Sequence, residues 1–179
     1  MVESGLTGLF HRVYYLMKLS LYFWGTALTG LVVFGVTPAL MVMIDMHKEA
    51  QWDYQEIDWK ESWNSYKSYF KTGLGLLFFF GGLGLLLTWN LFLSVQFRGL
   101  LFLIIDFMLA VFLVLTVISY VICTALFTTF DISFWNAVKL AVLQVFVSPK
   151  DSFAVAFGLV VIGLITYKFP GLILFLSIG

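Results

Sequence analysis

Asp106 is the only charged residue between positions 99 and 130, and an acid in such an apolar stretch can do chemistry. Ionisable side chains inside a membrane are costly, and they usually face a bundle interior or a charged partner. Asp106 is therefore a candidate proton or substrate site, or a charge partner for another subunit. The structural alternative is that it pairs with Lys18 or Arg98, or reaches the membrane interface near the end of its helix.

Other groupings of reactive side chains are weak. Asp45, His47 and Glu49 place three possible metal ligands close together, but the chain has only two histidines, one cysteine and no HExxH motif. His11 and His47 do not assemble into a Ser-His-Asp or Cys-His set. The glycines of residues 73–84 lie in an apolar helical run rather than after a strand, which excludes a phosphate loop. We expect no catalytic residue, no cofactor, no metal and no enzymatic activity.

The elements that position these residues are membrane helices. Hydrophobic residues make up 61% of the 179 residues and charged residues only 11%, against about a quarter charged in soluble domains. Residues 19–44, 72–97 and 152–167 contain no charge. A helix needs about 20 apolar residues to cross the hydrocarbon core. The sequence predicts a multi-pass integral membrane protein, and its zero net charge disfavours a nucleic-acid partner.

The first predicted membrane segment, residues 13–44, contains a break near 35–38. Pro38 lacks a backbone N–H, so we expect Thr37 to cap a new helix whose first residue is Pro38. Gly35 adds to the break. The break either bends the chain from spanning to interfacial, or lines a polar cavity as broken helices do in transporters.

Two further segments are predicted to lie flat in the membrane interface, at about 57–71 and 131–146. Aromatic residues form one face of the first segment and lysines lie toward its end, while the second carries Trp135 and Lys139. The partner or interface candidates are Trp59, Trp63, Tyr66, Lys67, Phe70, Lys71, Trp135 and Lys139. The aromatic face is either a membrane-interface belt or a docking surface for a partner.

The remaining predicted spans are residues 72–96, 100–127 and 152–168, with a tight turn at Arg98 and Gly99 between the first two. Residues 171–179 begin a fifth helix that is too short to span. Lys18 lies near the start of the first span, where its long side chain can reach the interface. The predicted fold is an all-α transmembrane bundle of four to five membrane helices with two or three interfacial helices. Six basic residues against four weakly favour a cytoplasmic face at 45–71 and 128–151, with the N-terminus outside.

Three stretches resemble the YesL-like family of small bacterial membrane proteins, a group of unknown function. They are "GVTPAL" at 35–40, "WNSYKSYFKTG" at 63–73 and "FWNAVKLAV" at 134–142. The resemblance implies an all-helical membrane bundle in the cell membrane of a Gram-positive-type bacterium. It also implies genes often placed beside carbohydrate ABC transporters and polysaccharide-degrading enzymes. It implies no catalytic residues.

These patterns favour a non-enzymatic accessory or assembly subunit associated with a carbohydrate ABC transporter permease. The expected partners are the lipid bilayer and either permease subunits or further copies of this chain. The alternative is a stand-alone or oligomeric small-solute transporter or channel that uses the first-helix break and Asp106. A third hypothesis is a membrane-stress or lipid sensor that works through the aromatic interfacial helices.

Overall fold

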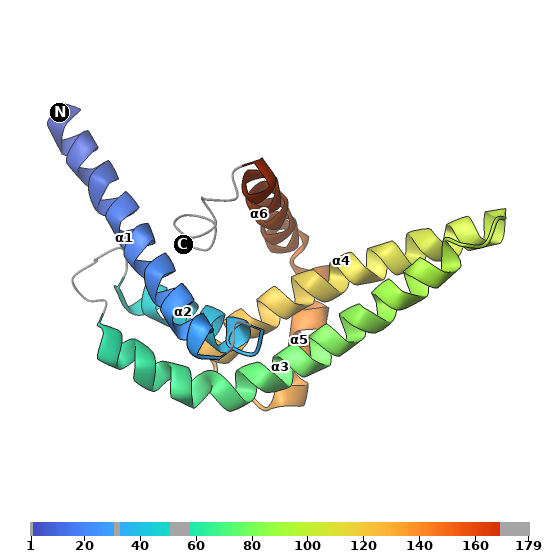
Figure 1. Ribbon diagram of the computed structural model, residues 1–179, viewed down its shortest axis with the longest axis horizontal. Helices are drawn as coiled ribbons and strands as arrows, with labels where there is room; N and C mark the ends of the chain where they lie inside the picture. Colours follow the sequence, from blue (N-terminus) through green and yellow to red (C-terminus); the bar gives the residue numbers. More distant parts are fainter. Residues whose placement is uncertain (1, 31–32, 51–57, 169–179) are drawn as a thin grey trace. The chain divides into compact units, whose positions relative to one another are not determined.

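The computed structural model describes residues 2–30, 33–50 and 58–168, and this part of the chain is helical, without a strand (Figure 1). The helices are α1 (Val2–Thr29), α2 (Val36–Ala50), α3 (Trp59–Ser94), α4 (Leu100–Thr129), α5 (Phe134–Val147) and α6 (Pro149–Lys168). The all-α prediction is confirmed. The predicted fifth helix at 171–179 lies outside the described residues, as does residue 57 of the first interfacial segment.

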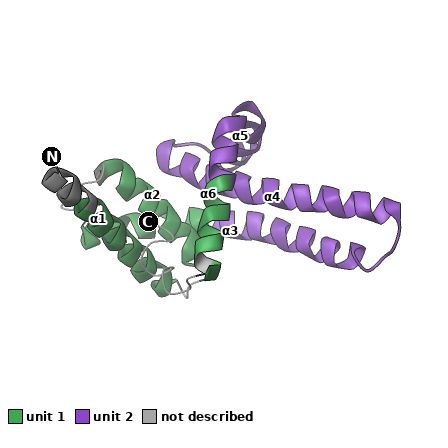
Figure 2. Cartoon of the chain, turned by 90° about the horizontal axis from the view of Figure 1, so that it is seen from above, with its two compact units in different colours: residues 1–73, 157–179 green, residues 74–156 purple. Residues whose placement is uncertain are grey.

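Two of the described helices, α3 and α4, are long and apolar enough to cross a membrane. A third crossing is possible if α5 and α6, which are bent by 98° at their junction, count as one broken span. The chain divides into two compact units, residues 1–73 with 157–179 and residues 74–156, which Figure 2 distinguishes by colour. Each unit is described by itself below.

In the first unit, α1 and α2 form an antiparallel hairpin. Tyr15 Oη and His47 Nδ1 lie 3.0 Å apart although the residues are 32 positions apart in sequence. At the other end of the hairpin, Gly35 packs against the backbone of Ala27. The structure therefore differs from the predicted span at 13–44: the chain reverses direction instead of continuing across.

The break also lies earlier than predicted. α1 begins at Val2 rather than near Val13 and ends at Thr29, and α2 begins at Val36. The N–H of Ala39 donates to the carbonyl of Gly35 at 2.9 Å, so Thr37 is inside the helix rather than its cap. Pro38 fits in this first turn because the N–H groups there have no helical acceptor.

The core of the first unit is aromatic and aliphatic. Its buried members are Tyr15, Leu19, Phe23, Ala27, Ala39, Val42, Met46 and Tyr66. α1 and α2 each contribute residues at helical spacing, which buries one apolar stripe per helix, and the first part of α3 contributes Tyr66. The first part of α3 is thereby held by packing against the hairpin.

The predicted interfacial helix at 57–71 and the predicted span at 72–96 form one continuous helix, α3, of 36 residues. The glycines at 73 and 75 do not interrupt it. At Gly73 the helix approaches α2 so closely that an added Cβ would lie 2.8 Å from the nitrogen of Pro38. Close packing of this kind uses glycine's missing side chain and offsets its poor helix propensity.

In the second unit, α3 from residue 74 and α4 form an antiparallel hairpin. Phe80 and Tyr120 are in ring contact at 5.9 Å, and Phe97 stacks on Phe102 at 4.9 Å beside the turn. Gly99 adopts φ 152° at this turn, a conformation that favours glycine. The predicted tight turn between these helices is thus present.

α5 packs on α4 through a narrow face of small and branched residues, Ala137, Val138, Ala141 and Val145. The chain then bends into α6 at Ser148 and Pro149. Pro149 cannot donate to the carbonyl of Val145, and the hydroxyl of Ser152 donates to that carbonyl instead, at 3.1 Å. The carbonyl of Val145 therefore keeps a hydrogen-bond donor at the bend.

Candidate functional site

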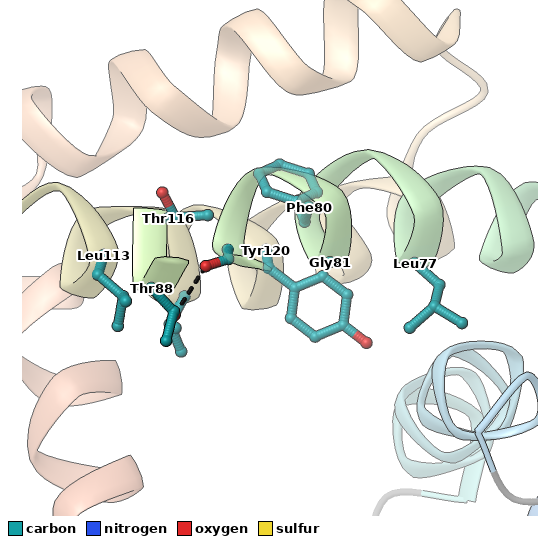
Figure 3. Close-up of a pocket in the computed structure, with 9 residues that line it drawn as sticks. Leu77, Phe80, Gly81, Thr88, Leu113, Thr116 and Tyr120 are labelled. Atoms are coloured by element: carbon teal, nitrogen blue, oxygen red, sulfur yellow. Dashed lines mark hydrogen bonds between the residues drawn. The ribbon is translucent and has the colours of Figure 1, made fainter. Parts of the chain in front are cut away.

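The hairpin of α3 and α4 carries an apolar groove of about 340 Å³ on one side. Leu77, Gly81 and Gly84 of α3 and Leu113 and Val117 of α4 are among its lining residues, and Figure 3 shows several of them. Its lining is almost wholly apolar. A groove of this composition suits a lipid chain or an apolar helix and does not suit a polar solute.

Three glycines of α3 in this region have no close neighbour. A Cβ added to Gly81, Gly82 or Gly84 would meet nothing within 4 Å, whereas one added to Gly75 would lie 3.4 Å from Phe134. Small residues let membrane helices approach closely. The described residues thus leave this part of α3 open to such an approach.

Most polar side chains of the hairpin bond to their own helix. Thr88 donates to the carbonyl of Gly84 at 2.8 Å, drawn as a dashed line in Figure 3, and Asn90 donates to Leu86 at 2.7 Å. Thr116 donates to the carbonyl of Phe112 at 2.8 Å. Such bonds satisfy a hydroxyl or amide within an apolar surrounding, so these residues carry no sign of a binding site.

Unlike these residues, Asp106 and Ser94 each keep a polar atom that forms no hydrogen bond. The Oδ1 atom of Asp106 and the Oγ atom of Ser94 are buried and have no hydrogen-bond partner. Arg98, one of the two predicted structural partners of Asp106, is exposed at the turn and forms no ion pair with it. Of the predicted site residues, Asp106 and Tyr66 each keep a buried polar atom that the structure leaves unsatisfied.

The aromatic face predicted as an interface belt packs against α1 and α2 instead. Tyr66 is 4% exposed and stacks on Trp63 at 5.7 Å, while Phe70 packs against the same core. Trp59 contacts Tyr22 at 5.3 Å and remains half-exposed. An aromatic stripe at helical spacing is the pattern of a core face as well as of a membrane belt, and here the core explanation holds for most of it.

The predicted lysines remain at the surface. Lys67 and Lys71 are exposed on α3, and the Lys67 ammonium lies 5.4 Å from the ring centre of Trp63. On α5, Trp135 and Lys139 are both exposed. Lys18 is half-buried on α1 with its ammonium 5.8 Å from the ring of Tyr22, as expected of a basic side chain that lies along apolar surface.

The break residues do not line a polar cavity in the described part of the chain. Thr37 and Pro38 are fully buried, and Gly35 is in contact with the backbone of Ala27. These three residues are therefore in contact with other parts of the protein and do not border an open cavity. The two predicted roles were a bend from a spanning to an interfacial segment and the lining of a polar cavity, and this packing does not agree with the second.

The acidic end of α2 has its own electrostatics. Tyr69 donates a hydrogen bond to Asp45 at 3.1 Å. Partial burial raises the pKa of Glu49, and the nearby charges of Asp45 and Glu61 raise it further. Within the described ranges no group of three or more acidic, histidine or cysteine side chains could hold a metal ion.

Sequence reasoning missed three of these features. Ser94 and Ser152 are single serines in apolar helices and give no periodic signal. The pair of Tyr15 and His47 could be found only by knowing that the chain reverses between them. The glycine pair at 30 and 35, spaced around the reversal, was the available signal for that turn.

The described helices define a helical membrane protein. Residues 16–91 match the model of the family described as "Protein of unknown function, DUF624", the group that comprises the YesL-like proteins. The predicted YesL-like resemblance is confirmed over this part of the chain, which runs from α1 to near the end of α3. No curated protein and no solved structure matches the chain.

Proposed function

We propose that this protein is a non-enzymatic accessory or assembly subunit that binds the membrane subunits of a carbohydrate ABC transporter. The observation that carries the proposal is the open groove of the α3–α4 hairpin, with glycines that no described residue covers. A partner helix can lie close to such a surface and gain van der Waals contact. The carbohydrate link comes from the gene neighbourhood that the YesL-like resemblance implies.

The proposed topology is multi-pass in a bacterial cell membrane. α3 and α4 cross the bilayer, α6 makes a third crossing, and the α1–α2 hairpin enters and returns on one side. The count therefore falls below the predicted four to five crossings within the described residues, because the first predicted span is a hairpin.

This topology strengthens the assignment of the cytoplasmic side. In it, most basic residues lie on the side that holds both ends of the hairpin and α5. They are Arg12, Lys18, Lys48, Lys60, Lys67, Lys71, Lys139 and Lys150, with Arg98 and Lys168 on the other side. An excess of lysine and arginine marks the cytoplasmic side. The N-terminus is then cytoplasmic rather than outside.

The test is co-purification with the permease. The chain is co-expressed with the two membrane subunits of a carbohydrate ABC transporter from the same organism and extracted in a mild detergent. Recovery of the subunits in fixed ratio supports the proposal, and failure to recover them contradicts it. Gly84→Leu fills the groove and should lower recovery by about tenfold, since a blocked helix contact weakens association.

Gly82→Leu is the matched control for this experiment. Gly82 also has nothing within 4 Å, but it does not line the groove. The same leucine there should leave recovery near the wild-type level. Equal losses in the two variants would assign the effect to the added bulk on α3 rather than to the groove.

A second candidate, a stand-alone or oligomeric small-solute transporter or channel, is favoured only by the unsatisfied Asp106. The closed break removes its other support. This candidate predicts that the purified protein moves solute across liposomes and that Asp106→Asn abolishes the flux. Liposomes of the wild-type protein that show no flux above empty liposomes would eliminate it.

A further inference from the structure

One exposed stripe of α5 is polar at its start and apolar at its end. Its members follow one another at steps of four, three and four residues and therefore share one side of the helix: Trp135, Lys139, Val142 and Phe146. The side chains of Trp135, Val142 and Phe146 are 63%, 43% and 68% exposed. Lys139 is exposed as well, and it is the only charged residue of α5.

This stripe borders an apolar groove of about 280 Å³ between α5 and the α3–α4 hairpin. Val142 and Phe146 line the groove from α5, and Phe79 lines it from α3. The ring of Trp135 contacts the ring of Phe79 at 5.8 Å, which places Trp135 at the edge of the groove. All of the lining residues belong to the unit of residues 74–156 (Figure 2).

The α5 groove is distinct from the groove proposed above as the permease contact. The two grooves share Phe80 and Thr116, and their other lining residues differ. Gly84 lines the first groove only, and Val142 lines the α5 groove only. Substitutions at these two positions therefore block the grooves separately.

α5 runs from the end of α4 toward its middle. Phe134, the first residue of α5, lies 6.1 Å ring to ring from Phe127, near the end of α4 at Thr129. Toward the other end of α5, Phe146 shares the groove with Leu115, which is about 20 Å along α4 from Thr129. If α4 crosses the bilayer as proposed, the polar end of the stripe lies toward the headgroups and the apolar end toward the acyl chains.

A phospholipid has the same order of polarity along the membrane normal. An ammonium group attracts a phosphate, and a tryptophan at the membrane interface holds its ring in the apolar region and its N–H toward the headgroups. In the proposed topology this end of α4 is cytoplasmic, and anionic lipids give the cytoplasmic leaflet a negative surface potential. The charge of Lys139 is therefore complementary to the lipids that surround it.

We infer that the α5 groove binds an acyl chain of an anionic phospholipid of the cytoplasmic leaflet, with the phosphate held at Lys139 and Trp135. The Lys139 ammonium donates to a phosphate oxygen, and the indole N–H of Trp135 is a second donor. Val142 and Phe146 contact the chain. The site requires no permease and rests only on the proposed crossing of α3 and α4.

The test counts the lipids bound to the purified full chain by native mass spectrometry. The protein is freed of lipid by washing in detergent and is then given phosphatidylglycerol or phosphatidylcholine with identical acyl chains. Wild type should bind one phosphatidylglycerol and prefer it by about fivefold, the effect of one lysine near a headgroup. Lys139→Ala should remove this preference, whereas Lys60→Ala, at an exposed lysine of α3, should keep it.

Val142→Trp tests the groove itself. The larger side chain fills the space for the acyl chain and should lower the binding of both lipids by about tenfold, because the chain loses apolar contact. Val147→Trp is the matched control, since Val147 is 77% exposed and does not line the groove. Helix content and elution volume of each variant in detergent identify any variant that has failed to fold.

Three results would overturn the inference. The first is equal binding of the two lipids by wild type, and the second is a preference that Lys139→Ala retains. The third is lipid that a folded Val142→Trp protein still binds, because that lipid would belong to the general lipid shell. If wild type binds no lipid and Val142→Trp loses the permease, a partner helix occupies the groove and the inference also fails. Gly84→Leu tests the proposed function independently of these outcomes.

Discussion

Tyr15 on α1 and His47 on α2 are joined by a hydrogen bond of 3.0 Å between Oη and Nδ1. Their rings are also in tilted contact at 5.8 Å. Tyr15 lies in the middle of α1 and His47 near the end of α2 away from the turn, so this pair fixes the second half of α1 as antiparallel to α2. The chain therefore reverses direction between the two helices, and the topology proposed for the protein depends on this reversal.

Tyr15→Phe should destabilise the first unit. The change removes the hydroxyl and leaves the buried side of His47 without this partner, which typically costs about 1 kcal/mol. Thermal unfolding of the purified protein in detergent measures the loss. Tyr167→Phe, at a tyrosine that is 90% exposed, is the control and should have no effect.

A double-mutant cycle distinguishes a pairwise bond from separate contributions. If Tyr15→Phe and His47→Leu remove the same hydrogen bond, the double variant loses less unfolding free energy than the sum of the losses in the two single variants. Strict additivity of the two losses would contradict the pairing.

Cysteine labelling should place the N-terminus and the start of α3 on the same side of the membrane. In a Cys123→Ala background, cysteines replace the exposed residues His11, Lys60 and Gln96 one at a time. In intact cells a membrane-impermeant maleimide should label position 96 and should not label 11 or 60. All three should react once the membrane is opened. Labelling of position 11 without labelling of position 60 in intact cells would mean that α1 crosses the bilayer.

The sequence predicted the helical class and the long apolar helices because charge-free runs report directly on a lipid surrounding. It also predicted the turn at Gly99 from a basic residue and a glycine between two such runs. The first break was predicted near 35–38, whereas α1 ends at Thr29 and α2 begins at Val36. Pro38 gave the stronger local signal, but a proline is compatible with a first helical turn, and the actual turn begins at Gly30.

The aromatic face of α3 shows where sequence reasoning fails physically. Trp63, Tyr66 and Phe70 repeat at helical spacing, and this pattern is the same whether the face meets lipid headgroups or another helix. The packing of α1 and α2 against this face shows that it meets other helices rather than lipid headgroups. That packing requires the chain to reverse direction between α1 and α2, which local helix propensity does not specify. Asp106 was recognisable from its charge, whereas Ser94 is a single serine in an apolar helix and gave no signal in the sequence.

Gly73→Ala should destabilise the protein, whereas Gly81→Ala should not. A Cβ at Gly73 would lie 2.8 Å from the nitrogen and 2.9 Å from Cδ of Pro38, so α2 and α3 must move apart. Overpacking of this kind costs about 1–3 kcal/mol. A Cβ at Gly81 meets nothing within 4 Å, so the better helix propensity of alanine leaves stability equal or slightly higher. Thermal unfolding in detergent compares the two, and equal effects would contradict this account of the α2–α3 contact.

Glu49→Gln should stabilise the protein at neutral pH and not at acidic pH. The pKa of Glu49 is raised by partial burial and by the charges of Asp45 and Glu61. The folded state therefore holds this proton more tightly than the unfolded state, and stability is lost as pH rises through the raised pKa. Glutamine resembles the protonated form, so its benefit should vanish below about pH 4, where glutamate is protonated in both states. Unfolding midpoints at pH 4 and pH 7 measure this, and an equal benefit at both would assign it to packing.

Ser152→Ala should destabilise the bend between α5 and α6. The hydroxyl of Ser152 donates to the carbonyls of Val145 and Ser148, at 3.1 and 3.2 Å, in a site where the side chain is 7% exposed. Pro149 cannot supply the N–H that the carbonyl of Val145 would otherwise receive, so the alanine variant leaves that acceptor unsatisfied at a cost of about 1–3 kcal/mol. Ser133→Ala is the matched control, because Ser133 precedes α5 without forming a side-chain cap.

The same interaction predicts coupling between Ser152 and Pro149. Pro149→Ala restores a backbone N–H that can reach the carbonyl of Val145, and the hydroxyl is then no longer the only donor for it. Ser152→Ala should therefore cost less in the Pro149→Ala background than in wild type, as measured by thermal unfolding of the four proteins in one detergent. If Ser152→Ala lowers the stability equally in both backgrounds, the hydroxyl of Ser152 does not compensate for the missing N–H of Pro149. Other contacts must then hold the bend of 98°.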